Sequence, residues 1–179
     1  MLSYKKLIGM TAIVLTAAFA SYYLLKSQTP KFKVYKDENF QVTYPADYSV
    51  IRAPVANGYA VFIYKGNNPD PQHPGALCNK FSIEINVNSD GFCGSAAFMG
   101  RTTNIVTTQV KLAGQTVTKS DDYIKEYKEA VQISYDDLKF NSKFGSVLIW
   151  LDPRDQVNYE RNKQLFESIV NTLQLTQAN

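Results

Sequence analysis

The chain has 179 residues, of which 45% are hydrophobic and 20% are charged. This is the composition of a folded globular protein and excludes a disordered one. Two of the 19 basic side chains, Lys5 and Lys6, lie in residues 1–25, which carry no acid, so the rest has 17 basic and 16 acidic side chains and a net charge of +1. A near-neutral domain lacks the basic surface that nucleic-acid binding requires, so nucleic acid is excluded as a partner.

After a short tail of residues 1–6, the segment Leu7–Leu25 has nineteen residues without a charge. A helix rises about 1.5 Å per residue, so this length reaches across a hydrocarbon core about 30 Å thick. The segment is predicted to be a transmembrane anchor or an uncleaved signal, with the membrane as a partner. As the alternative, Ala18 and Ala20 have the spacing that signal peptidase accepts, and cleavage after Ala20 would release a secreted chain.

The side of the membrane on which the domain lies is not decided by charge, because lysines flank the apolar segment at both ends. The cleavage site and the two cysteines favour export. We therefore expect a single-pass protein of the cytoplasmic (inner) membrane, with residues 26–31 as a linker and a C-terminal domain that is periplasmic or extracellular. A domain that faces the cytoplasm remains an alternative, for which two free thiols would be the evidence.

Cys78 and Cys93 are the two cysteines, with fourteen residues between them. In an exported chain such a pair predicts a disulfide, which for a loop of this size stabilises the fold by about 3 kcal/mol. Two buried free thiols are the alternative. Two cysteines and one histidine do not make a tetrahedral metal site, so no metal is expected.

The loop 66–78 is long for a hairpin connection, and we interpret it as a possible interaction surface that includes Asn68, Asp70 and His73. A nucleophilic Cys78 activated by His73 and oriented by Asp70 is the chemical alternative. It is disfavoured because this stretch is rich in Pro, where His and Asp are ordinary surface residues.

Alternation of apolar and polar residues predicts half-buried antiparallel strands through most of the chain after residue 31. The predicted strands lie in "NFQVTYP", "FSIEINV", "VTTQVKL" and "AVQISY", with "AGQ" as a turn. Two further runs, residues 59–64 and 146–151, are apolar on both faces. They are expected to form central strands that are covered on both sides.

A covering helix is predicted from about Asn158, where one stripe gathers apolar side chains at helical spacing. Its start is placed at Asp152–Pro153 or at Asn158. The stripe consists of Leu165, Phe166, Ile169, Val170 and Leu173. Residues 93–101 and 121–130 are candidates for a second covering helix, with a loop or an extended hairpin as the alternative for each.

The segment "YKDENFQVTYPADYSV", followed by "LFESIVNTLQL", resembles the PsbP-like family and the related Mog-type fold over residues 34–175. The matching positions are Phe40, Val42, Tyr44, Pro45 and Tyr48, together with Ile169, Thr172 and Leu173 near the end. Asn39 stands where Gly is usual, and Tyr48 stands where Trp is common. The resemblance implies an antiparallel sheet between helices, and a non-catalytic accessory or binding module that often has one N-terminal membrane segment in bacteria.

Together these features predict an α+β fold, an antiparallel β-sheet covered by helices in a PsbP-like sandwich over residues 32–175, preceded by an N-terminal transmembrane helix and followed by a tail of residues 176–179. No catalytic, cofactor-binding or metal-binding motif is found. The pairs Asp121–Asp122 and Asp136–Asp137 are interpreted as solvated turns beside strands, with a metal-binding or acid–base pair as the alternative for each. The predicted function is a membrane-tethered extracytoplasmic binding or accessory module near an unknown protein partner. An exported hydrolase is the alternative.

Overall fold

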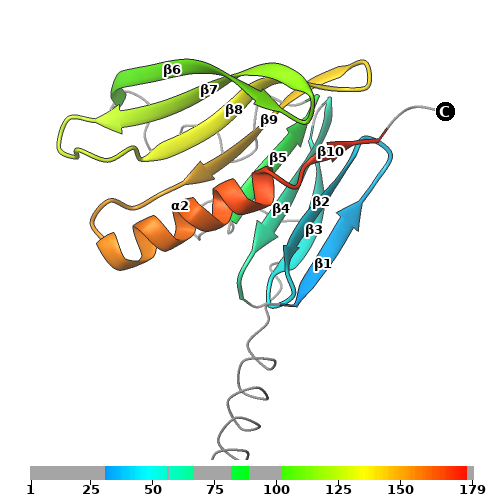
Figure 1. The fold of residues 1–179 in the computed structure, drawn as a ribbon, viewed down its shortest axis with the longest axis horizontal. Coiled ribbons are helices and arrows are strands. Elements are labelled where there is room, and N and C mark those ends of the chain that lie inside the picture. Colours follow the sequence, from blue (N-terminus) through cyan, green and yellow to red (C-terminus); the bar gives the residue numbers. More distant parts are fainter. Residues whose placement is uncertain (1–30, 56, 67–81, 89–101, 177–179) are drawn as a thin grey trace, which may run out of the picture. The chain divides into compact units, whose positions relative to one another are not determined.

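The alternating segments fold into antiparallel strands that make up most of the described chain (Figure 1). The computed structural model describes residues 31–55, 57–66, 82–88 and 102–176. The strands are β1 Phe32–Lys36, β2 Phe40–Pro45, β3 Ser49–Val55, β4 Gly58–Tyr64, β5 Ser82–Val87, β6 Thr102–Leu112, β7 Gln115–Ile124, β8 Gln132–Phe140, β9 Lys143–Trp150 and β10 Gln174–Leu175. The helix α2 spans Gln156–Val170.

The strands form two sheets. The large sheet has the order β3-β4-β5-β9-β8-β7-β6, and every neighbouring pair is antiparallel. The small sheet has the order β1-β2-β10, in which the chain returns after α2 to pair with β2. The register of β10, with Gln174 opposite Gln41, joins the last described strand to one of the first.

The helix α2 begins where the sequence offers good capping residues. Asp155 is the N-cap and its carboxylate accepts a hydrogen bond from the Asn158 backbone N–H at 3.3 Å, so the start lies between the two predicted positions. The predicted stripe is confirmed, because Phe166, Ile169 and Val170 are buried. Leu173 is also buried, although it lies after the helix ends.

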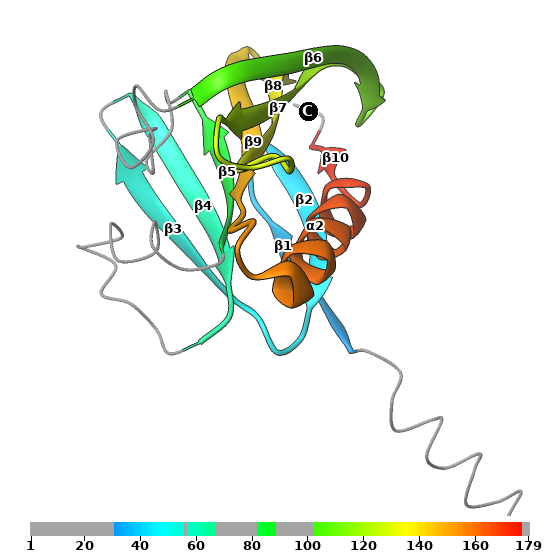
Figure 2. The ribbon, with the colours of Figure 1, turned by 90° about the vertical axis from the view of Figure 1, so that its left-hand side faces the viewer.

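The helix and the small sheet lie side by side on the same face of the large sheet, which we call the packed face (Figures 1 and 2). The alternation of β2 places Phe40, Val42 and Tyr44 against this face, as their spacing predicts. One continuous core results from the two layers. From β4, β5, β8 and β9 it takes Tyr59, Val61, Ile63, Ile83, Ile85, Val87, Ile133, Val147 and Ile149.

The predicted α+β sandwich is wrong, because the described residues are mainly strand and contain a single helix. The second covering element is the small sheet. Residues 121–130 are not a helix: β7 continues to Ile124 and a turn follows, which is the extended alternative. In this segment Asp121 and Asp122 face opposite sides of a paired strand, so strand pairing overrides its helical spacing. Residues 93–101 lie outside the described chain.

Two expectations about exposure also change. All of Ser82–Val87 is buried, so the polar side chains of β5 do not face water as their alternation predicts. Residues 59–64 are buried on both faces, as expected. In β9 the apolar Leu148 and Trp150 are only half-buried, so this strand is covered less completely than residues 59–64.

The N-terminal segment Leu7–Leu25 falls outside the described residues, as do Cys78 and Cys93. Within the described part of the chain, no helix combines the length and apolar character needed to cross a bilayer. The disulfide stays a prediction.

Candidate functional site

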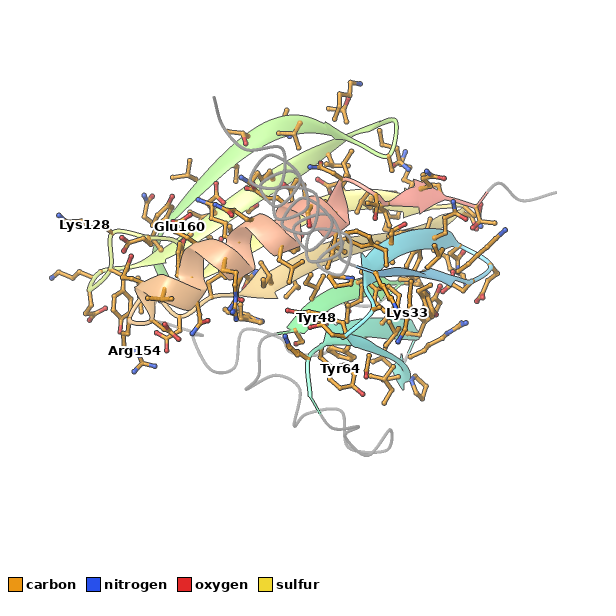
Figure 3. The ribbon with its side chains drawn as sticks, turned by 60° about the horizontal axis from the view of Figure 1, so that its bottom comes forward. Lys33, Tyr48, Tyr64, Lys128, Arg154 and Glu160 are labelled. Atoms are coloured by element: carbon orange, nitrogen blue, oxygen red, sulfur yellow. The ribbon has the colours of Figure 1, made fainter. Side chains whose placement is uncertain are left out.

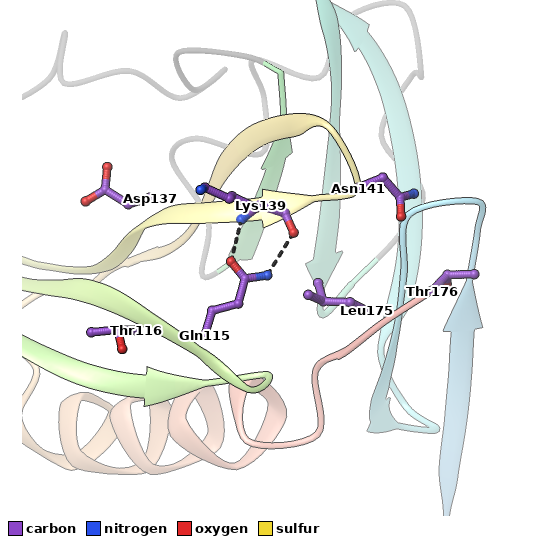
Figure 4. Close-up of a pocket in the computed structure, with 7 residues that line it drawn as sticks. All are labelled: Gln115, Thr116, Asp137, Lys139, Asn141, Leu175 and Thr176. Atoms are coloured by element: carbon purple, nitrogen blue, oxygen red, sulfur yellow. Dashed lines mark hydrogen bonds between the residues drawn. The ribbon is translucent and has the colours of Figure 1, made fainter. Parts of the chain in front are cut away.

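A pocket of about 480 Å³ lies where the end of the large sheet meets the last described strand of the small sheet (Figure 4). It collects residues that are far apart in sequence, from the start of β7, the end of β8, the β8–β9 turn and the region of β10. We call it the junction pocket. Its lining residues are Gln115, Thr116, Asp137, Lys139, Asn141, Leu175 and Thr176.

The backbone around the junction pocket is irregular. The β8–β9 register shifts between Tyr135 and Leu138, and Asp137 within this bulge has a φ of 64°. Asn141 in the next turn has a φ of 58°, and Ala113 in the β6–β7 turn has a φ of 49°. Such values cost energy for residues other than glycine and are enriched at binding and active sites. A bulge also redirects side chains next to a site.

Gln115 fixes the start of β7 to the end of β8. Its side-chain Nε2 donates to the Lys139 carbonyl at 2.8 Å, and its Oε1 accepts from the Lys139 backbone N–H at 3.0 Å (Figure 4). Close by, the Thr118 hydroxyl donates to Asp137 Oδ2 at 2.8 Å. Hydrogen bonds therefore connect the two strands, β7 and β8, that carry the side chains at the mouth of the pocket.

The opposite wall is held by a polar network that includes the buried Asn39. The Asn141 amide donates to Asn39 Oδ1 at 3.2 Å, and the Asn39 amide donates to the Tyr59 hydroxyl at 2.8 Å. Asp37 Oδ2 accepts from the hydroxyls of Tyr59 at 2.8 Å and Tyr35 at 3.1 Å. The network links both sheets, so it positions one side of the pocket relative to the other.

The tyrosines of this network stay neutral. Burial, followed by the charge of Asp37, raises the pKa of Tyr35. Burial also raises the pKa of Tyr59 above its ordinary value. The guanidinium of Arg52 lies 3.7 Å from the centre of the Tyr59 ring and pairs with Glu38 through two hydrogen bonds. Two neutral tyrosine hydroxyls thus donate to the Asp37 carboxylate. This arrangement stabilises the structure and is not suited to acid–base chemistry.

The lining of the junction pocket carries one basic and one acidic side chain, and a further lysine, Lys111, contacts the lining residue Thr116. Lys139 lines the pocket, with its Nζ 5.6 Å from the Phe144 ring centre, and Lys111 Nζ donates to the Thr116 hydroxyl at 2.6 Å. Asp137 is the acidic residue of the lining. Hydroxyls, amides and an ammonium group in one concave place can bind a polar or anionic group by hydrogen bonds.

The face of the large sheet opposite the packed face has two parts. On β3 and β4 it carries a smaller apolar cluster of Ile51, Ala53, Ala60, Phe62 and Tyr64, against which Trp150 packs. On β5, β7 and β8 it is polar, and we call this part the polar face. The hydroxyls of Ser134 and Ser120 both donate to Asp136 Oδ2, at 2.7 Å and 3.3 Å. Burial, followed by the charges of Asp136 and Asp121, raises the pKa of Asp122. Because both serines donate to one carboxylate oxygen, the cluster lacks the chain of nucleophile, base and orienting group that an activated serine needs.

The polar face continues onto β5, where Glu84 is 1% and Asn86 is 0% exposed. The Asn86 amide donates weakly to the Ser146 hydroxyl at 3.4 Å. Its Oδ1 is the buried side-chain oxygen that finds no hydrogen-bond partner among the described side chains. Gly145 explains the close approach here, since a Cβ at this position would lie 1.9 Å from the Asn86 carbonyl oxygen.

A smaller pocket of about 220 Å³ lies between β7 and α2. Its charged lining is balanced: Lys128 and Glu160 lie near the start of α2 (Figure 3), and Lys119 Nζ is 3.7 Å from Asp121 Oδ1. The buried Tyr159 donates to the Ala130 carbonyl at 3.0 Å. Since lysines and acids alternate around it, this pocket has no preference for a ligand of either charge.

The predicted interaction residues Asn68, Asp70 and His73 fall outside the described residues, so the structure does not place them. Asp121–Asp122 and Asp136–Asp137 are described, and the prediction that they are solvated turns is wrong: the first pair lies in β7 and the second in the bulge of β8. In the described ranges, no group of three or more metal-ligating His, Asp or Glu side chains comes together.

The junction pocket itself was not predicted. The predicted turn "AGQ" is correctly located and ends with Gln115, but nothing in the sequence pairs this residue with Lys139. The one sequence signal is "YDDLKFNSK", where polar residues interrupt the alternation of β8 just before a turn. An interruption of this kind is typical of a bulge.

Comparisons with known proteins give similarities to solved structures but none to sequences. No protein-family model matches the chain, and no curated protein sequence matches it. The fold is similar to the solution structure of cyanobacterial PsbP (CyanoP) from Synechocystis sp. PCC 6803, with a TM-score of 0.47 and 10% identity, over 82% of this chain and 93% of that chain. This is a PsbP protein, the family that the residues around Tyr44 resemble. A similarity at this TM-score and identity carries no information about function.

Proposed function

We propose that this chain is a non-catalytic binding module that holds a polar segment of a partner in the junction pocket. The observation that carries the proposal is the coincidence of a concave, hydrogen-bonding surface with strained backbone. Asp137 and Asn141, both at positive φ, line the pocket, and Ala113 at positive φ stands two residues before Gln115. Strain of this kind persists where the surrounding contacts hold it, and Gln115 and Asn39 supply those contacts.

The chemistry of the pocket favours a partner with carbonyl or carboxylate oxygens. Lys139 offers an ammonium group and Thr116 a hydroxyl, while Leu175 supplies an apolar surface between them. An extended peptide segment presents such oxygens together with small apolar groups. We therefore expect an acidic or neutral peptide segment to bind here in preference to a basic one.

The module acts outside the cytoplasm in this proposal. Its support is the sequence: the basic residues Lys5 and Lys6, the apolar stretch after them, and small residues at Ala18 and Ala20. Cleavage after Ala20 would export the domain, and we propose the same side for a domain that keeps the stretch as an anchor. Thiol titration of the native protein with and without reductant tests the location, because two free thiols would contradict export.

Site-directed photo-crosslinking tests the binding role. A benzophenone amino acid replaces Thr116, which is exposed at the pocket, and in a matched control it replaces Gln164, which is exposed on α2. We expect one defined partner adduct from position 116 in native cells, identified by mass spectrometry. Absence of an adduct, or the same adducts from position 164, contradicts the proposal.

A charge reversal then assigns the adduct to the pocket. Lys139→Glu changes the lining while the backbone groups that hold Gln115 remain, so the adduct from position 116 should fall at least tenfold. Lys125→Glu makes the same charge change at an exposed turn residue outside the pocket and should leave the yield unchanged. Equal losses in both variants would mean that net charge, not the pocket, determines the contact.

A further inference from the structure

The outer edge of β6 is a long, exposed strand edge. Among the described residues β6 is the last strand of the large sheet and pairs on one side only, with β7. Residues 104–109 are all exposed, with Ile105 at 57% and Val106 at 43%. An exposed edge of this length offers a row of backbone donors and acceptors to another strand.

The β6–β7 turn determines which backbone groups point outward. Ala113 and Gly114 both have positive φ, at 49° and 79°, which is the type I′ turn of a two-residue hairpin. In such a hairpin the flanking residues, here Leu112 and Gln115, form a hydrogen-bonded pair. Because pairs alternate along an antiparallel ladder, every second residue of β6 directs its N–H and C=O away from β7. These residues are Ile105, Thr107, Gln109 and Lys111.

The edge lacks the devices that usually prevent sheets from joining. From Thr102 to Val110 the strand has no charged residue and no proline, and the bulge between Thr102 and Asn104 leaves the ladder from Ile105 to Leu112 continuous. Natural edge strands commonly carry lysine, proline or an inward charge for protection. An uncharged edge of this length therefore indicates that another strand pairs with it.

We propose that this edge binds a second copy of the same chain, with two β6 strands antiparallel about a two-fold axis at Thr108. In this register Thr107 and Gln109 of the two copies exchange both backbone hydrogen bonds. Val106 of one copy lies opposite the half-buried Val110 of the other on the packed-face side, so that the exposed Val106 of each copy is covered. The arrangement is isologous and closes after two copies.

Charge complementarity favours a second copy over an unrelated extended peptide. The same register places Lys111 of one copy opposite Ile105 of the other. Within that second copy, Ile105 is paired with Asp122 on β7. A long lysine side chain can lie over Ile105 toward that carboxylate, and the two-fold axis repeats the contact. No like charges stand opposite one another. Within one chain Lys111 donates to the Thr116 hydroxyl, and in the dimer it would exchange this contact for the one across the axis. None of the residues that meet across the axis lines the junction pocket.

Disulfide trapping of the full chain tests the register. Thr108→Cys places one thiol on each side of the axis in a pair that is not hydrogen-bonded, where the Cα atoms come about 4.5 Å apart, close enough to bond. We expect mild oxidation to convert most of this variant to a covalent dimer on a non-reducing gel. The unaltered chain gives the background from Cys78 and Cys93.

Two matched variants distinguish the predicted pairing from random collision. Val110→Cys lies on the same strand and side, but its two copies are far apart across the axis, so alone it should not form a dimer. Mixed with differently tagged Val106→Cys chains, it should give the mixed dimer. Equal dimer yields from Val110→Cys alone and from Thr108→Cys, or no dimer from Thr108→Cys, overturn the proposal, as does a cross-link to another protein in place of a second copy.

A backbone variant tests the edge itself. Thr107→Pro removes an N–H that points away from β7, a position where an edge strand tolerates proline. Light scattering of the full chain should give twice the chain mass for the unaltered protein and one chain mass for this variant, with an unchanged far-ultraviolet circular dichroism spectrum. An unaltered chain that stays monomeric at about 100 µM, or a variant that stays dimeric, overturns the proposal.

Discussion

The two faces of the large sheet differ although the same strands make both. On the packed face, Ile83 and Ile85 of β5 meet α2 and the small sheet in one apolar core. On the polar face, the intervening Glu84 and Asn86 are equally buried. Period-two alternation normally separates a buried face from a solvated one, whereas here it separates an apolar buried face from a polar buried one.

The difference shows where the fold obtains its stability and where it does not. Burial of apolar area contributes roughly 25 cal/mol per Å², and the packed face collects most of the buried large side chains. A buried polar group stabilises little even when it is hydrogen-bonded, and it costs energy when it is not. The packed face therefore contributes most of the stability, with a smaller apolar cluster around Phe62 on the other side of β3 and β4. At the polar residues of β5, β7 and β8, substitution is expected to cost little or even to be favourable.

The largest effect is expected for Ile85→Ala on the packed face. Ile85 is buried in the core, so its truncation removes apolar contacts and leaves a cavity that costs about 2–5 kcal/mol. Chemical denaturation of the variant and the unaltered chain measures the difference in the free energy of unfolding. Val34→Ala, at an exposed residue of β1, is the control and should change it by less than about 0.5 kcal/mol. Equal losses at both positions would contradict the comparison.

Tyr159→Phe is expected to have the next largest effect, because it removes one hydrogen bond beneath α2 without changing the packing. The hydroxyl donates to the Ala130 carbonyl, and an unpaired buried acceptor costs about 1–3 kcal/mol. Burial raises the pKa of Tyr159 to about 12. The native state therefore holds its proton more tightly than the unfolded state, so stability is lost as pH rises from about 10 through that value.

Denaturation at pH 7 and at alkaline pH measures both parts of this prediction. The cost of Tyr159→Phe should be largest at neutral pH and should shrink as the unaltered chain loses stability above pH 10. Tyr127→Phe, at a half-buried turn residue, serves as the control for general tyrosine ionisation. If the loss of stability caused by Tyr159→Phe does not depend on pH, Tyr159 ionises alike in the folded and the unfolded state.

The sequence predicts which residues form the packed face, but it does not predict that the polar residues opposite them are buried. Alternation located β2 and both of its faces, and helical spacing identified Phe166, Ile169 and Val170. Alternation could not show that Glu84 is buried, because the pattern reports only that neighbours point to opposite sides. The covering layer was misassigned for a related reason: whether a sheet or a helix covers an apolar face depends on long-range pairing, such as Gln174 with Gln41.

The junction pocket marks a second limit of the sequence. Its lining comes from irregular backbone at Asp137 and Asn141, where the conformation results from a register shift between β8 and β9. A register shift is a property of two strands together. Turn chemistry located the neighbouring hairpin turn before Gln115, because Gly114 is a local signal.

On the polar face, Asn86→Val should change stability by less than about 1 kcal/mol and can increase it, because it removes a buried oxygen without a partner among the described side chains. Valine also suits a strand. The weak hydrogen bond to Ser146 is lost, but the Ser146 side chain is only half-buried and can bind water. Ser146→Ala alone controls for this loss. A cost equal to that of Ile85→Ala would show that Asn86 is a required part of the fold.

The smallest effect is expected for Asp122→Asn, also on the polar face. Burial, then the charges of Asp136 and Asp121, raises the pKa of the Asp122 carboxyl above its ordinary value. The native state therefore binds this proton more tightly than the unfolded state, and stability falls as pH rises from about 4 through the raised pKa. Because the side chain is half-exposed, the amide should stabilise the neutral-pH protein by only about 0.3–1 kcal/mol.

The gain from Asp122→Asn must disappear on acidification, since below about pH 3 the carboxyl is protonated in both states and behaves like the amide. Denaturation curves at pH 7 and pH 3 for the variant and the unaltered chain measure this difference. Asp155→Asn is a control of the opposite kind: the amide still caps α2 but carries no charge, so it should give no gain at pH 7. A gain for Asp122→Asn that persists at pH 3 would assign it to packing and remove the electrostatic contrast between the two faces.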